Sequence, residues 1–151
     1  MIKIITVGTL KEKYLQEAIK EYSKRLQKYT NLEIIEVKDE GVVEPQKAIE
    51  IESSKIEKHL NNKDYVITLE IEGKEYSSPE FAEKIRNTLI ENSNITFIIG
   101  GSYGLSDSIK ERSNMHLSFS KMTFPHQLFR VILLEQIYRA YKINNNESYH
   151  K

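Results

Sequence analysis

The stretch from residue 94 to residue 141 constrains the fold more than any other part of the chain. Its first segment, Ile95–Ile99, is β-branched and aromatic, which is typical of a strand buried on both faces of a parallel sheet. That segment runs into the glycines of residues 100–104, where a ligand can approach bare backbone. A second apolar run, residues 116–119, leads into another loop, and an apolar helix follows over residues 128–141. The stretch therefore predicts two strand ends with unusual loops beside a buried final helix.

Strand and helix patterns alternate along the whole chain. Strands are predicted over residues 2–7, 32–37, 65–71, 95–99 and 116–119, a loop over 38–45, and helices over 10–26, 48–60, 78–90, 106–112 and 128–141. Thr9 and Ser106 are the predicted N-caps of the first and fourth helices. This order predicts an α/β fold in which helices cover both faces of a mostly parallel sheet, in one domain of residues 1–151.

Composition excludes several classes of protein. Acidic and basic residues balance at 22 each, so the net charge gives no indication of a nucleic-acid partner. It does not exclude one, because a neutral protein can carry a local basic patch. The absence of cysteine excludes disulfides and thiolate metal sites and fits a reducing cytosol, so we expect a cytoplasmic protein. No apolar run approaches the roughly 20 residues of a membrane span. The four histidines, His59, His116, His126 and His150, include no pair at i, i+4 spacing, and we expect no metal site.

The glycine loop is a weak motif when taken alone. Gly100, Gly101 and Gly104 form G-G-x-x-G, which differs from the G-x-G-x-x-G of dinucleotide-binding folds and lacks the G-K-[ST] of phosphate loops. A plain turn is an equally good interpretation of the glycine pair. No G-x-S-x-G elbow is present, which argues against a serine hydrolase.

The last helix is apolar in nearly every direction, which is typical of a helix buried on all sides. We expect it to pack against a second copy of the protein about a two-fold axis, with Leu134 and Tyr138 in the interface. The alternative is a central helix within one protomer. Glu135 and Arg139 stand at i, i+4 and are expected to pair.

Four segments together resemble a known family. They are FIIGGSYG at residues 97–104, LSFSKMTFPHQLFRV at 117–131, EQIYRA at 135–140 and YHK at 149–151. They closely resemble the ribosomal RNA large-subunit methyltransferase H family, and the resemblance extends along the whole chain. It implies a SPOUT-class enzyme with a C-terminal trefoil knot that works as a homodimer. The implied reaction uses S-adenosylmethionine to methylate N3 of a pseudouridine in 23S rRNA, within the large subunit or the assembled ribosome.

Strand-end positions and this resemblance together define the expected site. The cofactor-binding residues are expected to be Leu69, Gly101, Phe119, Ser120, Lys121, Met122, Thr123, Phe124 and Pro125. A Gly101→Val side chain is expected to enter the space of the ligand.

The RNA side of the site is assigned to residues at the start of the last helix and in the tail, namely His126, Arg130, Tyr149, His150 and Lys151. Arg130 and Lys151 would hold phosphate or the developing anion, and His126 or His150 could accept the N3 proton. Arg130 as a helix-surface charge and the last three residues as a frayed tail are the alternatives.

Three other functions stay open at this point. The first is a related knotted methyltransferase that acts on another RNA, such as tRNA. The second is a ribosome-binding factor without catalysis, and the third is a nucleotide-binding regulator that uses the glycine loop. A saturable adenosylmethionine site separates the first from the second, and phosphate-dependent binding would indicate the third.

Overall fold

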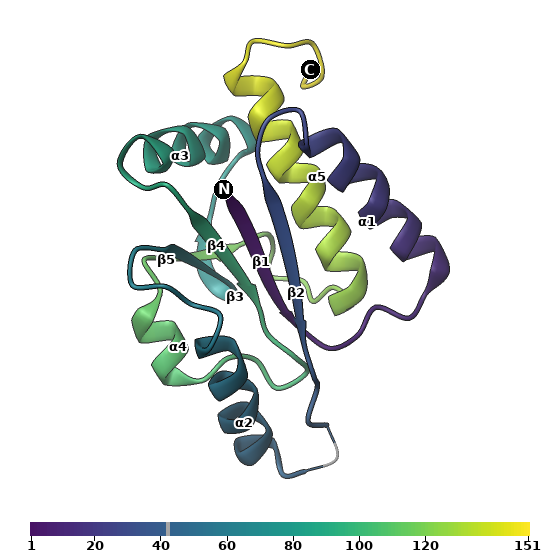
Figure 1. Cartoon of the computed structure of the whole chain (residues 1–151), viewed down its shortest axis with the longest axis vertical. Coiled ribbons are helices and arrows are strands. Elements are labelled where there is room, and N and C mark those ends of the chain that lie inside the picture. The colour runs from purple at the N-terminus through teal and green to yellow at the C-terminus, as the bar shows by residue number, and fades with distance from the viewer. Residues whose placement is uncertain (42) are drawn as a thin grey trace.

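The predicted strands form one five-stranded sheet with the order β2-β1-β4-β3-β5, and every pair in it is parallel (Figure 1). The computed structural model describes residues 1–41 and 43–151. The strands are β1 Ile2–Val7, β2 Leu32–Val37, β3 Tyr65–Glu75, β4 Ile95–Ile99 and β5 Met115–Ser118; the helices are α1 Lys13–Leu26, α2 Pro45–Glu57, α3 Ser78–Glu91, α4 Asp107–Arg112 and α5 His126–Asn144. The predicted α/β class is therefore confirmed.

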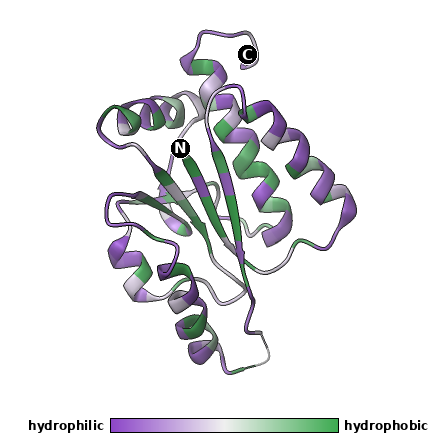
Figure 2. Cartoon of the chain, in the orientation of Figure 1, coloured by the Kyte–Doolittle hydropathy of each residue, from purple (hydrophilic) through white to green (hydrophobic). Residues whose placement is uncertain are grey.

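Helices cover both faces of the sheet because alternate strand residues point to opposite sides. Ile2 and Ile4 of β1 join a large core formed with α1, α3 and α5. Ile5 and Val7 join a smaller core with α2 and α4. Figure 2 shows hydrophobic residues concentrated on the strands and polar residues spread over the outer helices. Strands β1 and β4 are accordingly buried along their whole length.

The first helix starts later than predicted, and Thr9 does not cap it. The helix begins at Lys13, and its N-cap Glu12 makes no side-chain capping bond. Gly8, with φ of 100°, turns the chain, and the Leu10 amide donates to the carboxylate of Glu36, so residues 8–12 form a loop. The Ser106 cap of α4 is confirmed, since its hydroxyl accepts from the Ile109 amide.

The second helix is shifted toward the N-terminus and buries a different face. It begins at Pro45, and proline suits the first turn because that turn needs no amide donor. The apolar spacing predicts Ile49, Ile51, Ile56 and Leu60 as its inner residues, and of these only Ile56 is buried, beside Ala48, Glu52 and Ser53. Val42, within the predicted loop 38–45, lies outside the described residues.

Strand β3 pairs irregularly with β5. Leu69 and Lys74 both align with Leu117, so the intervening residues of β3 bulge out of the ladder. Gly73 permits this arrangement, because a Cβ there would stand 2.8 Å from backbone atoms of His116 and Leu117. The shift lies at the carboxyl end of the sheet, beside β5.

The amino end of the sheet is closed by buried polar contacts. Lys3 is 5% exposed, and its ammonium donates to the His59 carbonyl at 2.8 Å and pairs with Asp64 at 3.3 Å. Arg112 of α4 donates to the carbonyls of Asn61 and Asp64, both at 3.0 Å. These bonds join β1, the segment between α2 and β3, and α4 at one end of the fold.

The last helix buries one side within the protomer and leaves its other side partly exposed, so the prediction of a helix buried on all sides does not hold within one chain. Leu133, Leu134 and Ile137 are fully buried against α1, α3 and the sheet. The assignment of Leu134 to a subunit interface is therefore wrong, because the protomer already encloses that side chain. In the described part of the chain, no helix combines the length and the apolar character needed to cross a membrane.

Candidate functional site

A cavity of about 420 Å³ lies at the carboxyl ends of β3, β4 and β5. Its walls come from the β3 bulge, the glycine loop after β4, the loop after β5 and the first turn of α5. Ile71, Tyr103 and Met122 are exposed apolar side chains that all line it. A cavity of this size with mostly apolar walls is typical of a site for a small organic molecule.

The glycine loop brings backbone close to the cavity. Gly101 and Gly104 form an isolated bridge, in which the Gly104 amide donates to the Gly101 carbonyl at 3.1 Å. A Cβ on Gly100 would stand 3.0 Å from the Gly104 backbone, and Gly104 has φ of 85°. Both positions therefore require glycine, one for close packing and the other for its left-handed conformation.

The loop of residues 119–125 is folded tightly against α5. The rings of Phe119 and Phe124 pack on Phe129, with centroid distances of 5.0 and 5.9 Å. The Ser120 hydroxyl accepts from the Met122 amide at 3.0 Å. The loop thus presents backbone groups beside an aromatic wall, which suits a flat heterocycle with hydrogen-bonding edges.

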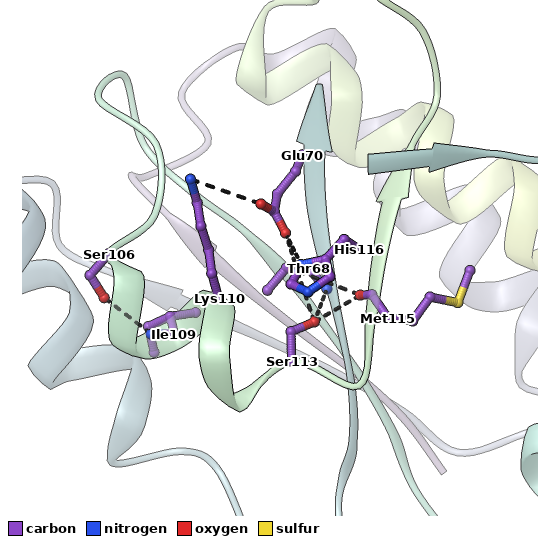
Figure 3. A network of polar contacts seen from close by, with 8 residues as sticks. All are labelled: Thr68, Glu70, Ser106, Ile109, Lys110, Ser113, Met115 and His116. Atoms are coloured by element: carbon purple, nitrogen blue, oxygen red, sulfur yellow. Dashed lines mark hydrogen bonds and ion pairs between the residues drawn. The ribbon is translucent and has the colours of Figure 1, made fainter. Parts of the chain in front are cut away.

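A polar network forms the wall of the cavity on the β3–β5 side (Figure 3). Glu70 accepts from the Thr68 hydroxyl at 2.6 Å, contacts the His116 ring through Nδ1, and lies 3.9 Å from the Lys110 ammonium. The Thr68 hydroxyl also lies 2.8 Å from the hydroxyl of Ser113. Glu70 and Lys110 both line the cavity, so this wall carries one charge of each sign.

A buried acid lies directly beneath the glycine loop. Glu52 is 3% exposed; its Oε2 accepts from the Glu40 amide at 3.1 Å, while Oε1 has no partner. A Cβ on Gly101 would stand 3.2 Å from that Oε1 and 3.0 Å from Val7. Burial raises the pKa of the Glu52 carboxyl, and nearby acids add to the effect.

The structure brings most of the predicted cofactor residues together. Those lining the cavity are Leu69, Gly101, Phe119, Ser120, Met122, Thr123 and Phe124. Lys121 and Pro125 belong to the same loop but are not among the lining residues. The reason given for Gly101→Val is wrong, because the added side chain would point toward Val7 and Glu52 beneath the loop and away from the cavity.

The residues predicted for the RNA side lie in three places. His126 lines the cavity at the start of α5. Arg130 is buried, with its guanidinium bonded to Glu36 at 2.6 Å and to the carbonyls of Val7 and Gly8 at 3.3 and 2.9 Å. It is therefore no surface charge, and a contact with RNA would require these bonds to open.

Tyr149, His150 and Lys151 lie far from their own cavity. Tyr149 and His150 contact Glu135 and Arg139 of α5. Roughly 20 Å of helix separates Arg139 from His126, and Figure 1 shows the tail beyond the opposite end of α5. Within one protomer the tail residues therefore do not meet the cavity.

Sequence reasoning missed Glu70, Lys110 and Phe129. Glu70 directly follows the predicted Leu69, so its position at a strand end was a usable signal. Phe129 follows His126 by three residues and thus shares its helix face. Nothing in the pattern around Lys110 indicates that α4 turns it toward β3. Among residues 1–41 and 43–151, no three His, Cys, Asp or Glu residues are grouped as metal ligands.

Known proteins give an independent comparison. The family described as "Predicted SPOUT methyltransferase" matches residues 1–150. A protein of Methanococcus maripaludis is 58% identical over 99% of both chains. Proteins of Clostridium acetobutylicum and Clostridium botulinum, both named ribosomal RNA large subunit methyltransferase H, are 52% and 54% identical, again over 99% of both chains.

The solved structure of a probable methylase family protein from Haemophilus influenzae superposes with a TM-score of 0.58 at 14% identity, covering 99% of this chain and 70% of that one. At this identity the likeness concerns the fold alone. The family match over nearly every residue, together with relatives more than half identical along their full length, identifies this chain as a member of the SPOUT methyltransferase family.

Proposed function

We propose that the protein transfers a methyl group from S-adenosylmethionine to N3 of a pseudouridine in 23S rRNA. The observation that carries the proposal is the cavity at the ends of β3, β4 and β5, built from the segments that resemble the methyltransferase H family. The names of the full-length relatives support an rRNA substrate. Since that substrate is ribosomal, we place the reaction in the cytoplasm.

The cavity fits the proposed cofactor in size and chemistry. Its volume lies within the roughly 300–1,000 Å³ that small-molecule sites occupy. Leu69, Phe119 and Phe124 offer apolar surfaces for an adenine, and the backbone near Gly101 is open to close approach. The lining contains Lys110 and His126 but also Glu70 and Glu72, so the site lacks the excess positive charge of a phosphate cradle.

The bound cofactor would supply an electrophilic methyl group, and the chain would align the RNA base with it. The N3 proton of the base must leave, for which His126 at the cavity and His150 in the tail are the proposed groups. Tyr149 would support His150, while Arg130 and Lys151 would act on phosphate or the developing anion. Glu36 currently neutralises Arg130, which makes Lys151 the freer of the two cations.

We propose that the enzyme is a homodimer of single-domain protomers and that each tail serves the partner's cavity. The support is geometric: His150 lies at the far end of α5 from its own cavity, so only another protomer's cavity is within plausible reach. The C-terminal trefoil knot of the SPOUT class is part of the same proposal. It rests on the family resemblance, since knots are otherwise rare.

A methyl-transfer assay tests the function. Tritiated S-adenosylmethionine is incubated with the protein and with intact ribosomes, naked 23S rRNA or tRNA, and labelled nucleosides are identified by mass spectrometry. The expected product is N3-methylpseudouridine from ribosomal RNA. Label in tRNA alone would reassign the substrate, and absence of saturable cofactor binding by calorimetry would leave a ribosome-binding factor.

A chain that ends at Glu147 tests the role of the tail. Glu147 accepts hydrogen bonds from Tyr29 and Lys142, both at 2.8 Å, so the shortened chain retains these anchors. It should bind S-adenosylmethionine like the parent and lose methyl transfer. Transfer at the parent rate would move the proposed base to His126 or to the RNA. Sedimentation velocity of the parent at micromolar concentration tests the dimer.

A further inference from the structure

The C-terminal tail is held in one defined arrangement on α5. Glu147 is bonded to Tyr29 and Lys142, and these bonds lower the pKa of its carboxyl. Two residues later, the Tyr149 ring packs edge-to-face on Tyr138, with centroids 5.0 Å apart. The alternative of a frayed tail therefore does not describe Tyr149, and Lys151 is left exposed.

Three side chains form the centre of the contact, and we call them the tail clamp: Glu135, Arg139 and Tyr149. Glu135 Oε1 accepts from Arg139 Nη2 at 2.6 Å and from the Tyr149 hydroxyl at 3.1 Å. The Arg139 guanidinium lies over the Tyr149 ring at 4.8 Å from its centroid. Burial, aided by the Glu135 carboxylate, raises the pKa of Tyr149 to about 12, so the phenol stays protonated.

The clamp also reaches the neighbouring histidine. Arg139 Nη1 lies 3.1 Å from His150 Nδ1. A guanidinium can only donate, so Nδ1 must accept with its lone pair. In neutral imidazole one nitrogen carries the proton, and accepting at Nδ1 therefore places that proton on Nε2. The His150 ring is exposed, so this Nε2–H group is free to meet a partner.

We propose that Arg139 is a positioning residue that presents His150 to the target base as an Nε2–H donor. The inference deepens the proposed function and rests on it. It changes the role of His150 from proton acceptor to stabiliser of the negative charge that develops on a base carbonyl beside N3. Besides the clamp residues, the charged or titratable groups around this part of the tail include Lys142, Lys28 and Tyr29, which contact Glu147. Arg25 and Tyr22 of α1 pack on Tyr138.

In the methyl-transfer step, the proton on His150 Nε2 stays where it is. The N3–H proton passes to His126, the other acceptor proposed above, and the electron pair left on N3 forms the bond to the methyl carbon. The bond from that carbon to the sulfonium sulfur breaks, and its electrons stay on sulfur. Throughout, the His150 Nε2–H holds the carbonyl oxygen by a hydrogen bond.

Nitrogen NMR of the ¹⁵N-histidine-labelled full chain gives the first test, with the signal of His150 assigned by its loss in His150→Gln. The expected result is the Nε2–H tautomer in the parent, and a mixture of tautomers in Arg139→Gln. A parent signal from the Nδ1–H tautomer would overturn the inference. This readout needs no RNA, so it decides the tautomer even if the proposed function fails.

Kinetics on ribosomes give the second test. His150→Ala should lower kcat by about 100-fold, whereas His150→Gln, whose amide can donate but cannot act as a base, should stay within about 10-fold of the parent. Equal losses in the two variants would return His150 to the role of base.

Arg139 is tested in the same assay. Arg139→Gln should lower kcat by about 10-fold with unchanged cofactor affinity, and Arg139→Lys should recover part of the loss because it still donates. The matched control is Arg86→Gln, which breaks an exposed pair with Glu83 on α3 and should leave kcat unchanged. Parent-like kcat in Arg139→Gln would also overturn the inference.

Discussion

Each end of the sheet contains a buried acid, but only the acid at the amino end is paired with a cation. At the amino end, Asp64 is paired with Lys3 and flanked by further hydrogen bonds. At the carboxyl end, Glu52 is equally buried, and like Asp64 it has one oxygen without a partner, but no cation of the described residues forms an ion pair with it. The same end contains Gly8 and Gly104 in left-handed conformation.

This difference separates the parts of the fold that hold it together from the parts that form the site. A buried and paired acid stabilises the protomer only while its partner is present. A buried carboxyl without a cation costs stability, and turns that only glycine can adopt collect where a site needs an unusual shape. The amino end should therefore respond to mutation through stability, and the carboxyl end through ligand binding as well.

The largest expected effect comes from Lys3→Met at the amino end. The change leaves Asp64 buried without a cation, which should lower the free energy of unfolding by about 3–5 kcal/mol. Urea unfolding followed by circular dichroism measures it. The exposed pair in Arg86→Gln serves as control, with less than about 1 kcal/mol expected. Equal losses for the two variants would show that burial of the Lys3–Asp64 pair does not make it important for stability.

Gly73→Ala should come second. Its Cβ would stand 2.8 Å from the backbone of β5, so the bulge must shift at a cost of about 1–3 kcal/mol. The same shift should weaken cofactor binding, because the bulge lines the cavity. Thermal unfolding and calorimetry measure the two effects. Gly104→Ala is the control, because its Cβ meets no atom and only its positive φ is unfavourable for alanine. Parent-like cofactor affinity in Gly73→Ala would show that the bulge does not shape the site.

Glu52→Gln should stabilise the protein by about 1 kcal/mol at neutral pH, since it removes an unpaired buried charge. Burial raises the folded-state pKa above the unfolded value, so the folded parent holds a proton that the unfolded chain releases. The parent therefore loses stability as pH rises from about 4 through the folded pKa. Urea midpoints across this range should diverge between parent and variant with rising pH. A constant difference would contradict the argument.

Met122→Ala should have the smallest effect on stability. Its side chain is 76% exposed, so the free energy of unfolding should change by less than about 0.5 kcal/mol. Because Met122 lines the cavity, the Kd for S-adenosylmethionine should rise by about 5- to 10-fold. Ile90→Ala, equally exposed but on α3, is the control for binding. Equal Kd values in the two variants would exclude Met122 from the site.

The sequence predicts the order of elements well because each strand and helix carries its own periodicity. Four of the five strands fall within one residue of the predicted bounds, and the pair Glu135–Arg139 is confirmed at 2.6 Å. The errors arise where tertiary contacts override local pattern. Ile90 continues an apolar helix pattern yet is 77% exposed, and β3 extends to Glu75 because it pairs again with β5 after its bulge.

The site was predictable where it depends on strand ends and family motifs, as for the loop 119–125. It was not predictable where side chains meet across the fold. The bonds of Arg130 to Glu36 and Val7 join residues about 100 positions apart, and no local pattern encodes them. The position of the tail on α5 is of the same kind.

The strand order has a consequence for how the chain is made. β1 lies between β2 and β4, so the first strand cannot gain its second neighbour until residues 95–99 have been synthesised. At about 5–20 residues per second, the nascent chain would wait roughly 5–20 s with an apolar edge exposed. Parallel pairing between such distant segments also slows folding in free solution. We therefore expect refolding on the scale of milliseconds to seconds or slower, with the β1 amides on the β4 side unprotected in hydrogen exchange until β4 has joined the sheet.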